Sequence, residues 1–315
     1  AGIPCKQNRQ VGTGPRGFRS LAAIVDCVAG PVADLLELLD LEPIEVNIFR
    51  GRSPDEDRQR VFGGQVMGQA LVAAQRTVDD DRQAHSLHSY FLRPGDPTVP
   101  ILYEVDRIRD GRSFATRRVV AIQHGRAIFN MSVSFHVHET SDEYHLPMPT
   151  VAGPDELVGW TEYLATIQDD IPEEMAHWFN RPRPIETRPV KVHHPFKPVF
   201  EDPPINQLWF RAASAVPDDQ ALQQALLTYA VDMWLLDCST MPHGYQFSDP
   251  QMQMASLDHS MWFLRPFRAD DWLLLDAECI ATAGARGMNR ANIYSSDGRL
   301  VATANQEGLM RRLDS

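Results

Sequence analysis

The sequence is poor in cysteine and contains no CxxC pair, so neither a zinc site nor a disulfide framework is indicated. Its four cysteines are Cys5, Cys27, Cys238 and Cys279. No HExxH motif occurs, and the pairs His136/His138 and His193/His194 fit zinc-ligand spacing poorly. We therefore expect a protein of the reducing cytoplasm that uses no metal and no cofactor.

Several catalytic and nucleotide-binding motifs are also missing. The absence of GxSxG argues against a serine nucleophile of the α/β-hydrolase kind, and the absence of GxxxxGK[ST] and GxGxxG argues against a phosphate-cradling loop. The net charge of −12 argues against a nucleic-acid partner, because phosphate contacts need broad Lys/Arg surfaces. Arginines do gather in two stretches, where we expect most to lie on solvated strand faces: Arg107, Arg109, Arg112, Arg117 and Arg118, and Arg265, Arg268, Arg286 and Arg290.

The chain also lacks a long uninterrupted apolar run. Acidic residues, among them Asp34 and Glu37, interrupt the most apolar stretch, residues 21–41, which therefore predicts an amphipathic helix and no membrane span. Residues 1–20 are basic and have little apolar periodicity, so we interpret them as a flexible tail without function.

What is present is the composition of a globular protein long enough for two domains, with 315 residues, 43% of them hydrophobic and 23% charged. An internal repeat supports two domains. The segment YFLRP at 90–94 recurs as WFLRP at 262–266, and a strand-like apolar segment follows each, from Ile101 and from Leu273.

The same order of elements is expected in both halves. Helical periodicity covers 64–78 and 220–236, with a strand candidate before each helix, at 46–50 and 208–212. A curved antiparallel sheet that wraps one apolar helix buries both, which is the hotdog arrangement. We predict an α+β fold of two tandem hotdog domains, residues 21–137 and 205–315, with the proline-rich residues 138–204 as a surface connector containing one or two short helices.

The two predicted helices differ in one respect. Residues 58–78 contain no carboxylate, whereas the second helix places Asp232 among apolar residues. A buried carboxylate is costly unless it is hydrogen-bonded. Asp232 therefore marks a site if a sheet encloses the helix, and an ordinary polar face if the helix is exposed.

Four segments together resemble the acyl-CoA thioesterase II family of double-hotdog enzymes. The resemblance runs from about Leu21 to Arg312, and the segments are FGGQVMGQA at 62–70, HSLHSYFLRPGD at 85–96, SLDHSMWF at 256–263 and QEGLM at 306–310. It implies that Asp232, Ser256 and Gln306 orient the water that hydrolyses a fatty acyl-CoA to free fatty acid and CoA. Some relatives have Thr at the position of Ser256, and serine preserves the hydroxyl. The resemblance also implies a homo-oligomer.

Elementary chemistry agrees with this trio. The thiol that leaves a thioester has a pKa of about 8.5 and needs little protonation, so the demand falls on the nucleophile. A carboxylate among apolar neighbours has a raised pKa and is a better base near neutral pH. Gly63 and Gly64, at the start of the first helix, are candidate N–H donors to the oxyanion, unless they merely permit close packing.

Two other functions stay open at this point. Asp258 and His259 are the adjacent pair that an acyl-CoA hydratase or dehydratase would need, and a fold alone does not determine function. A non-catalytic acyl-CoA-binding protein would have kept the fold and lost the chemistry. His88 and His259 lie near the two repeat cores, and we expect both to be satisfied structural histidines.

Overall fold

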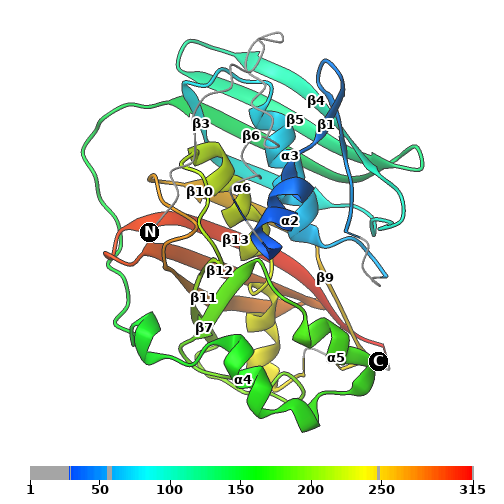
Figure 1. Cartoon of the computed structure of the whole chain (residues 1–315), viewed down its shortest axis with the longest axis vertical. Coiled ribbons are helices and arrows are strands. Elements are labelled where there is room, and N and C mark those ends of the chain that lie inside the picture. Colours follow the sequence, from blue (N-terminus) through cyan, green and yellow to red (C-terminus); the bar gives the residue numbers. More distant parts are fainter. Residues whose placement is uncertain (1–27, 29, 55–58, 247–248, 314–315) are drawn as a thin grey trace.

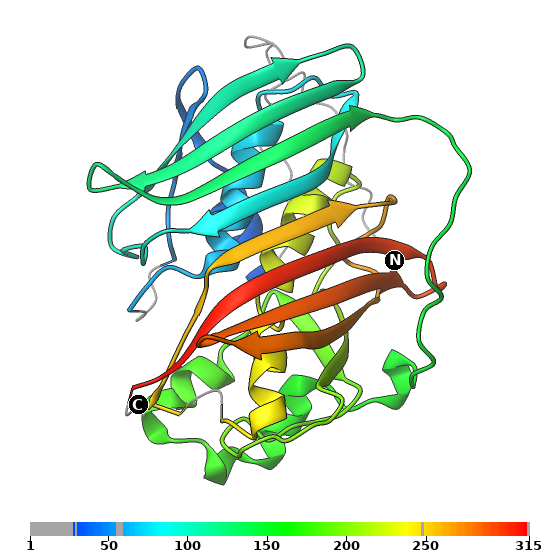
Figure 2. The same ribbon diagram turned by 180° about the vertical axis from the view of Figure 1, so that it is seen from behind.

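The computed structural model describes residues 28, 30–54, 59–246 and 249–313, so the tail expected at 1–20 lies outside the described residues. In these residues the strands form one antiparallel sheet, in the order β1-β2-β4-β5-β6-β3-β10-β13-β12-β11-β8-β7, with β9 also pairing with β13. The long helices lie against one face of this sheet (Figure 1), and Figure 2 shows the opposite face.

The elements follow the expected order in each half. The first half contains α2 (Pro31–Leu39), β1 (Glu42–Glu45), β2 (Ile48–Gly51), α3 (Gly63–Gln75), β3 (Arg82–Phe91), β4 (Ile101–Asp110), β5 (Phe114–Gln123) and β6 (Arg126–Val137). Then come η1 (Pro154–Glu156), α4 (Trp160–Thr166), η2 (Gln168–Asp170), α5 (Glu173–Asn180) and β7 (Ile185–Pro189). The second half contains β8 (Ile205–Ala212), α6 (Gln220–Val231), η3 (Leu236–His243), β9 (Met252–Ser256), β10 (Asp258–Phe263), β11 (Leu273–Ala283), β12 (Arg286–Ser295) and β13 (Leu300–Arg312).

The two halves meet where β3 pairs with β10. These are the strands that carry the repeated motif, and their register places His88 opposite Ser260. Because Tyr90 matches Trp262 in the repeat, Ser260 is also the residue that corresponds to His88. An approximate two-fold axis therefore passes between these two residues and relates the halves.

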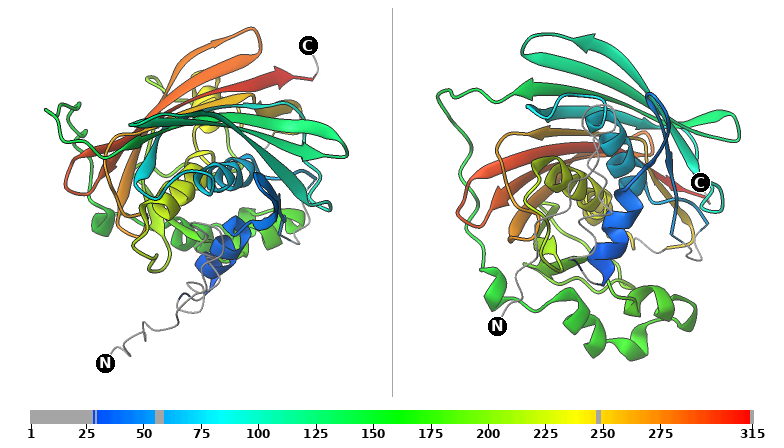
Figure 3. Two further views of the ribbon diagram at one scale, coloured as in Figure 1. Left: turned by 90° about the horizontal axis from the view of Figure 1, so that it is seen from above. Right: turned by 45° about the horizontal axis from the view of Figure 1, so that its top comes forward.

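The helices α3 and α6 lie side by side beneath the sheet (Figure 3), and their facing residues are buried. Close approach depends on a glycine of α3. A Cβ added at Gly64 would lie 2.3 Å from the backbone oxygen of Tyr229. A side chain there would separate the two helices, so the first half of the repeat carries the small residue that the packing needs.

The α+β prediction of two tandem hotdog arrangements is confirmed. Two details differ from the expectations. The stretch 138–204 contains α4 and α5 but also β7, which pairs with β8 and extends the sheet. The helix expected over 220–236 ends at Val231. In the part of the chain that the structure describes, no helix is long and apolar enough to cross a membrane.

Candidate functional site

Asp232 lies at the C-terminal cap of α6 and not inside the helix, which corrects the predicted helix boundary. The α-helical hydrogen bonds give way to tighter ones here, since the N–H groups of Met233 and Trp234 donate to oxygens three residues earlier. The chain then continues as the 3₁₀ helix η3. Tightening of this kind at a helix end is common, and it directs the Asp232 side chain toward β9 and β13.

Asp232, Ser256 and Gln306 meet in space, although they come from a helix end and two strands. The Nε2 atom of Gln306 donates to Oδ1 of Asp232 at 2.7 Å and lies 3.0 Å from Oγ of Ser256. The hydroxyl of Ser256 donates to the same carboxylate oxygen at 3.3 Å. Gln306 is fully buried, whereas Asp232 and Ser256 keep some accessible surface. The three residues therefore form one hydrogen-bonded group at the edge of the core.

Burial raises the pKa of Asp232 to about 7. Hydrogen bonds from Gln306, Ser256 and the backbone N–H of Gly64 favour the ionised form and limit this rise. The carboxylate is thus a base whose pKa lies near neutral pH, which is the range in which a general base works well. This environment is the one expected for a carboxylate with a functional role.

The first half of the chain completes the site with the N-terminal end of α3. A Cβ added at Gly63 would lie only 2.6 Å from Oδ2 of Asp232, so glycine allows the carboxylate to approach the start of α3 this closely. Gly64 donates its N–H to the carboxylate and also allows close packing against Tyr229. A helix N-terminus favours nearby negative charge, so this end of α3 suits both the carboxylate and an oxyanion.

Aromatic residues of the first half stand beside the carboxylate. The ring of Phe62 packs edge-on against Tyr229 with 5.2 Å between the centroids. The added Cβ of Gly63 would lie 3.0 Å from the ring of Phe91. The surroundings of Asp232 are therefore apolar on the side of α3, which explains the loss of solvation that raises its pKa.

The adjacent pair Asp258 and His259 does not converge on one point. Neighbouring residues of a strand point to opposite faces. The Asp258 carboxylate accepts the backbone N–H of Glu307 at 2.8 Å, whereas His259 is fully buried on the helix-facing side. The structure therefore gives no support to the hydratase alternative, which needs both groups on one substrate.

The two histidines near the repeat cores have different environments. His88 lies on the exposed face, where its Nδ1 is 3.1 Å from Oγ of Ser260, as expected for a satisfied histidine. His259 is buried, but neither of its ring nitrogens has a hydrogen-bond partner among the described residues. Unlike His88, His259 therefore has no direct hydrogen bond to another described residue.

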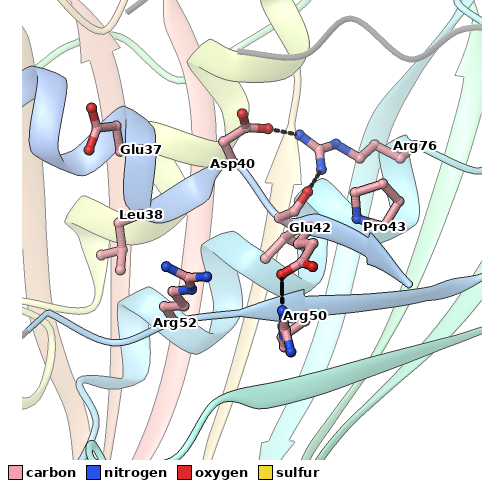
Figure 4. Close-up of a pocket in the computed structure, with 9 residues that line it drawn as sticks. Glu37, Leu38, Asp40, Glu42, Pro43, Arg50, Arg52 and Arg76 are labelled. Atoms are coloured by element: carbon pink, nitrogen blue, oxygen red, sulfur yellow. Dashed lines mark hydrogen bonds and ion pairs between the residues drawn. The ribbon is translucent and has the colours of Figure 1, made fainter. Parts of the chain in front are cut away.

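A cavity of about 530 Å³ lies elsewhere, between the end of α2, the β1–β2 hairpin and α3. Figure 4 shows that its charged side chains largely pair with one another. Arg76 pairs with Asp40, and Arg50 pairs with Glu42. Its lining includes neither Asp232 nor Ser256 nor Gln306. The group formed by Asp232, Ser256 and Gln306 therefore lies outside this cavity.

The histidine pairs considered as metal ligands form ordinary polar contacts. His193 lies 3.1 Å from Glu201, and His194 lies 3.0 Å from Asp170. Across the described ranges, no group of three His, Cys, Asp or Glu residues could hold a metal ion.

Comparison with known proteins gives consistent matches in both halves. Residues 52–136 match the family described as "Acyl-CoA thioesterase N-terminal domain", and residues 175–309 match "Acyl-CoA thioesterase". The chain is 39% identical over 278 residues to "Acyl-CoA thioesterase 2" of Haemophilus influenzae, covering 88% of this chain and 97% of that protein. It is also 39% identical over 282 residues to human "Acyl-coenzyme A thioesterase 8", covering 87% and 88% of the two chains.

A solved structure shares both the sequence and the architecture. The crystal structure of an acyl-CoA thioesterase II, TesB2, from Mycobacterium marinum is 39% identical to this chain. It superposes with a TM-score of 0.72, covering 88% of this chain and 98% of that one.

Proposed function

Because this chain belongs to the acyl-CoA thioesterase II family, we propose that the water that hydrolyses its acyl-CoA substrate is activated by Asp232 with the help of Ser256 and Gln306. The activity itself, hydrolysis of an acyl-CoA thioester, follows from the family. The observation that carries the assignment of residues is the convergence of Gln306 and Ser256 on Oδ1 of a carboxylate whose pKa is raised to about 7.

The geometry suggests separate roles for the two carboxylate oxygens. Oδ1 of Asp232 accepts hydrogen bonds from Ser256 and Gln306, so these residues orient the carboxylate itself. Oδ2 lies against the backbone at the start of α3, since a Cβ added at Gly63 would lie 2.6 Å from it. In our proposal a water donates one proton to Oδ2 as its oxygen bonds to the thioester carbon. The C–S bond then breaks as the tetrahedral intermediate collapses to the fatty acid, and the thiolate of CoA leaves with little need for protonation. Asp232 passes its proton to the thiolate or to solvent and is again a carboxylate.

The oxyanion of the tetrahedral intermediate would lie at the N-terminal end of α3. Of the two glycines considered as donors, Gly64 directs its N–H to the carboxylate. Gly63 is therefore the better candidate for the oxyanion, supported by the positive end of the α3 dipole. The second half would supply the base and the first half the donor, which gives one active site per chain.

A thiol-release assay tests the assignment. Wild type and Asp232→Asn should be incubated with saturated acyl-CoAs from short to long chain, with free CoA detected by a thiol-reactive dye. We expect fatty acyl-CoA hydrolysis in the wild type and a loss of about 10²- to 10⁴-fold in kcat in the variant, the range for removal of a general base. A folded Asp232→Asn protein with near-normal activity would contradict the proposal.

Other parts of the expectation stay predictions. A cytoplasmic location, a homo-oligomeric state and domain boundaries at 137/138 and 204/205 are each testable. Light scattering of the purified chain would measure the oligomeric state, and limited proteolysis would locate the boundaries.

A further inference from the structure

A row of three polar side chains crosses the buried face of the sheet at Gln306. The pairing of β12 with β13 places Asn289 directly opposite Gln306. On the other side β10 pairs with β13 through Ser260 and Asn305, and the same register one residue further places His259 opposite Gln306. All three side chains have no accessible surface.

Each member of this row has a polar atom without a hydrogen-bond partner among the described residues. These atoms are Nδ1 and Nε2 of His259, Oε1 of Gln306 and Nδ2 of Asn289. Buried polar groups are nearly always hydrogen-bonded, and leaving one unpaired costs stability. Three such residues side by side, one of them in contact with Asp232, indicate a group arranged for function.

The hydrogen bonds available to the row fix which way the amide of Gln306 points. Gln306 must present Nε2 to Asp232, because an ionised carboxylate only accepts hydrogen bonds, so Oε1 points the other way. Oε1 is an acceptor, and the residues on both sides of it offer N–H donors. A neutral imidazole has one N–H, and burial lowers the pKa of His259 to about 3, so its ring is neutral.

We propose that His259 is a positioning residue, assisted by Asn289, that holds Oε1 of Gln306 so that Nε2 of Gln306 faces Asp232. Opposed residues on neighbouring strands have Cβ atoms about 5 Å apart. One water between the ring and the amide, or a small rotation of the ring, connects the two groups over that separation. This inference rests on the proposed role of Gln306 at Asp232.

The first half shows which residues occupy the positions of His259, Gln306 and Asn289 where they have no carboxylate to contact. By the register of β3, β6 and β5, the corresponding residues are Leu87, Val133 and Arg117. Leu87 is fully buried, so leucine fits this position of the fold. His259→Leu therefore removes the donor with little risk to folding.

The test compares three variants in the thiol-release assay, each with a thermal melt. His259→Leu should lower kcat by about 10- to 100-fold, with KM within twofold and a melting temperature no lower than that of the wild type. His259→Asn, which keeps an N–H donor near Nδ1, should recover kcat to within about fivefold of the wild type. Met261→Leu is the matched control, because Met261 is equally buried two residues along the same strand, and it should leave kcat unchanged.

The outcomes separate this inference from the assignment of the base. An unchanged kcat in His259→Leu would overturn it, as would a loss of kcat that follows a lower melting temperature and is not recovered by asparagine. If the leucine variant does not fold, Asn289→Ala decides, with a kcat loss of about threefold or more at unchanged KM expected and none overturning the inference. Asp232→Asn measured in parallel tests the base itself: an inactive Asp232→Asn with a fully active His259→Leu refutes only the role of His259.

Discussion

The C-terminal ends of α3 and α6 occupy corresponding places in the two halves and carry opposite charges. At the end of α6 lies the carboxylate of Asp232. At the end of α3 lies the guanidinium of Arg117, which donates to the backbone oxygen of Thr77 at 2.9 Å. Charged groups of opposite sign therefore lie at the corresponding ends of the two helices, the carboxylate of Asp232 from the helix cap itself and the guanidinium of Arg117 from β5.

In the first half, each guanidinium nitrogen of Arg117 has a hydrogen-bond partner. Arg117 is 1% exposed, and it donates to Oγ1 of Thr77 at 2.8 Å, to the oxygen of Arg109 at 3.0 Å and to Asp110 at 2.5 Å. A cation at a helix C-terminus is stabilised by the dipole. Arg117 is the exception in its cluster, whose other four arginines are exposed as expected, and its contacts indicate a structural role.

In the second half, the carboxylate of Asp232 lies in an environment that is unfavourable for stability. Asp232 places a negative charge at a helix C-terminus, where the dipole opposes it, and burial raises its pKa further. Compensation comes from Gly64 at the N-terminal end of the other helix. One half therefore contributes stability at this end of its helix, whereas the other holds a carboxylate at a cost in stability, as expected for the base that we propose.

The largest effect on kcat is expected at the contact between the start of α3 in the first half and Asp232 in the second. Gly63→Ala would place a Cβ 2.6 Å from Oδ2 of Asp232 and push the carboxylate away from the start of α3. Since the displaced atom belongs to the carboxylate that Ser256 and Gln306 hold through Oδ1, function should suffer more than folding. We expect kcat to fall by about 10²-fold, comparable to the loss of an oxyanion donor.

Gly68→Ala is the matched control for this prediction, because its Cβ would lie 3.0 Å from Leu39 and 3.4 Å from the oxygen of Ala225, away from the carboxylate. Steady-state kinetics and thermal melts of both variants make the comparison. Equal losses of kcat in the two variants would count against a special role for the space beside Asp232.

The first half should respond in the opposite way. Arg117→Met removes a buried guanidinium and leaves the oxygens of Thr77 and Arg109 without a donor. We expect the free energy of unfolding to fall by about 2–4 kcal/mol with kcat unchanged. Urea unfolding and the thiol-release assay measure the two quantities.

Arg290→Met serves as the control, since Arg290 and Glu278 form an exposed pair worth little. A large loss of kcat in Arg117→Met at temperatures where it is folded would contradict a purely structural role for Arg117.

The sequence predicted the repeat, and the family resemblance named three residues whose side chains the structure brings together, but the local geometry was harder to predict. Periodicity located the helix of Asp232 but not its end, because the switch to tighter hydrogen bonds after Val231 depends on what the side chain binds in three dimensions. Asn289 was missed altogether, since its relation to Gln306 exists only through strand register. Arg117 was misjudged because nothing in its local sequence distinguishes it from the exposed arginines beside it. Aligning the two repeats position by position would have paired Arg117 with Asn289.

The pH dependence of hydrolysis tests whether Gln306 acts on the carboxylate of Asp232. Asp232 must be ionised to accept a proton, so kcat/KM should rise with pH through the pKa of about 7 and level off above it. Gln306 donates a hydrogen bond that lowers this pKa. In Gln306→Ala the rising limb should therefore move to higher pH, with a loss of about tenfold on the plateau. Profiles measured from pH 5 to 9 would show it, and a limb that stays in place would mean that Gln306 does not act on the carboxylate.

The smallest effect on kcat is expected for Ser256→Ala, which introduces the residue found at the corresponding position of the first half. By the register of the repeat, Ser256 corresponds to Ala84, so alanine fits this position of the strand. The hydroxyl contributes the longest bond of the trio, 3.3 Å to Oδ1 of Asp232, whereas Gln306 contributes 2.7 Å. We therefore expect kcat to fall only about three- to tenfold, with an unchanged melting temperature.

Ser256→Thr, which keeps the hydroxyl, should stay close to the wild type, because the bond to Asp232 requires only a donor. A loss in Ser256→Ala as large as in Asp232→Asn would instead assign the hydroxyl a direct part in the attack, since merely orienting the carboxylate cannot matter as much as the carboxylate itself.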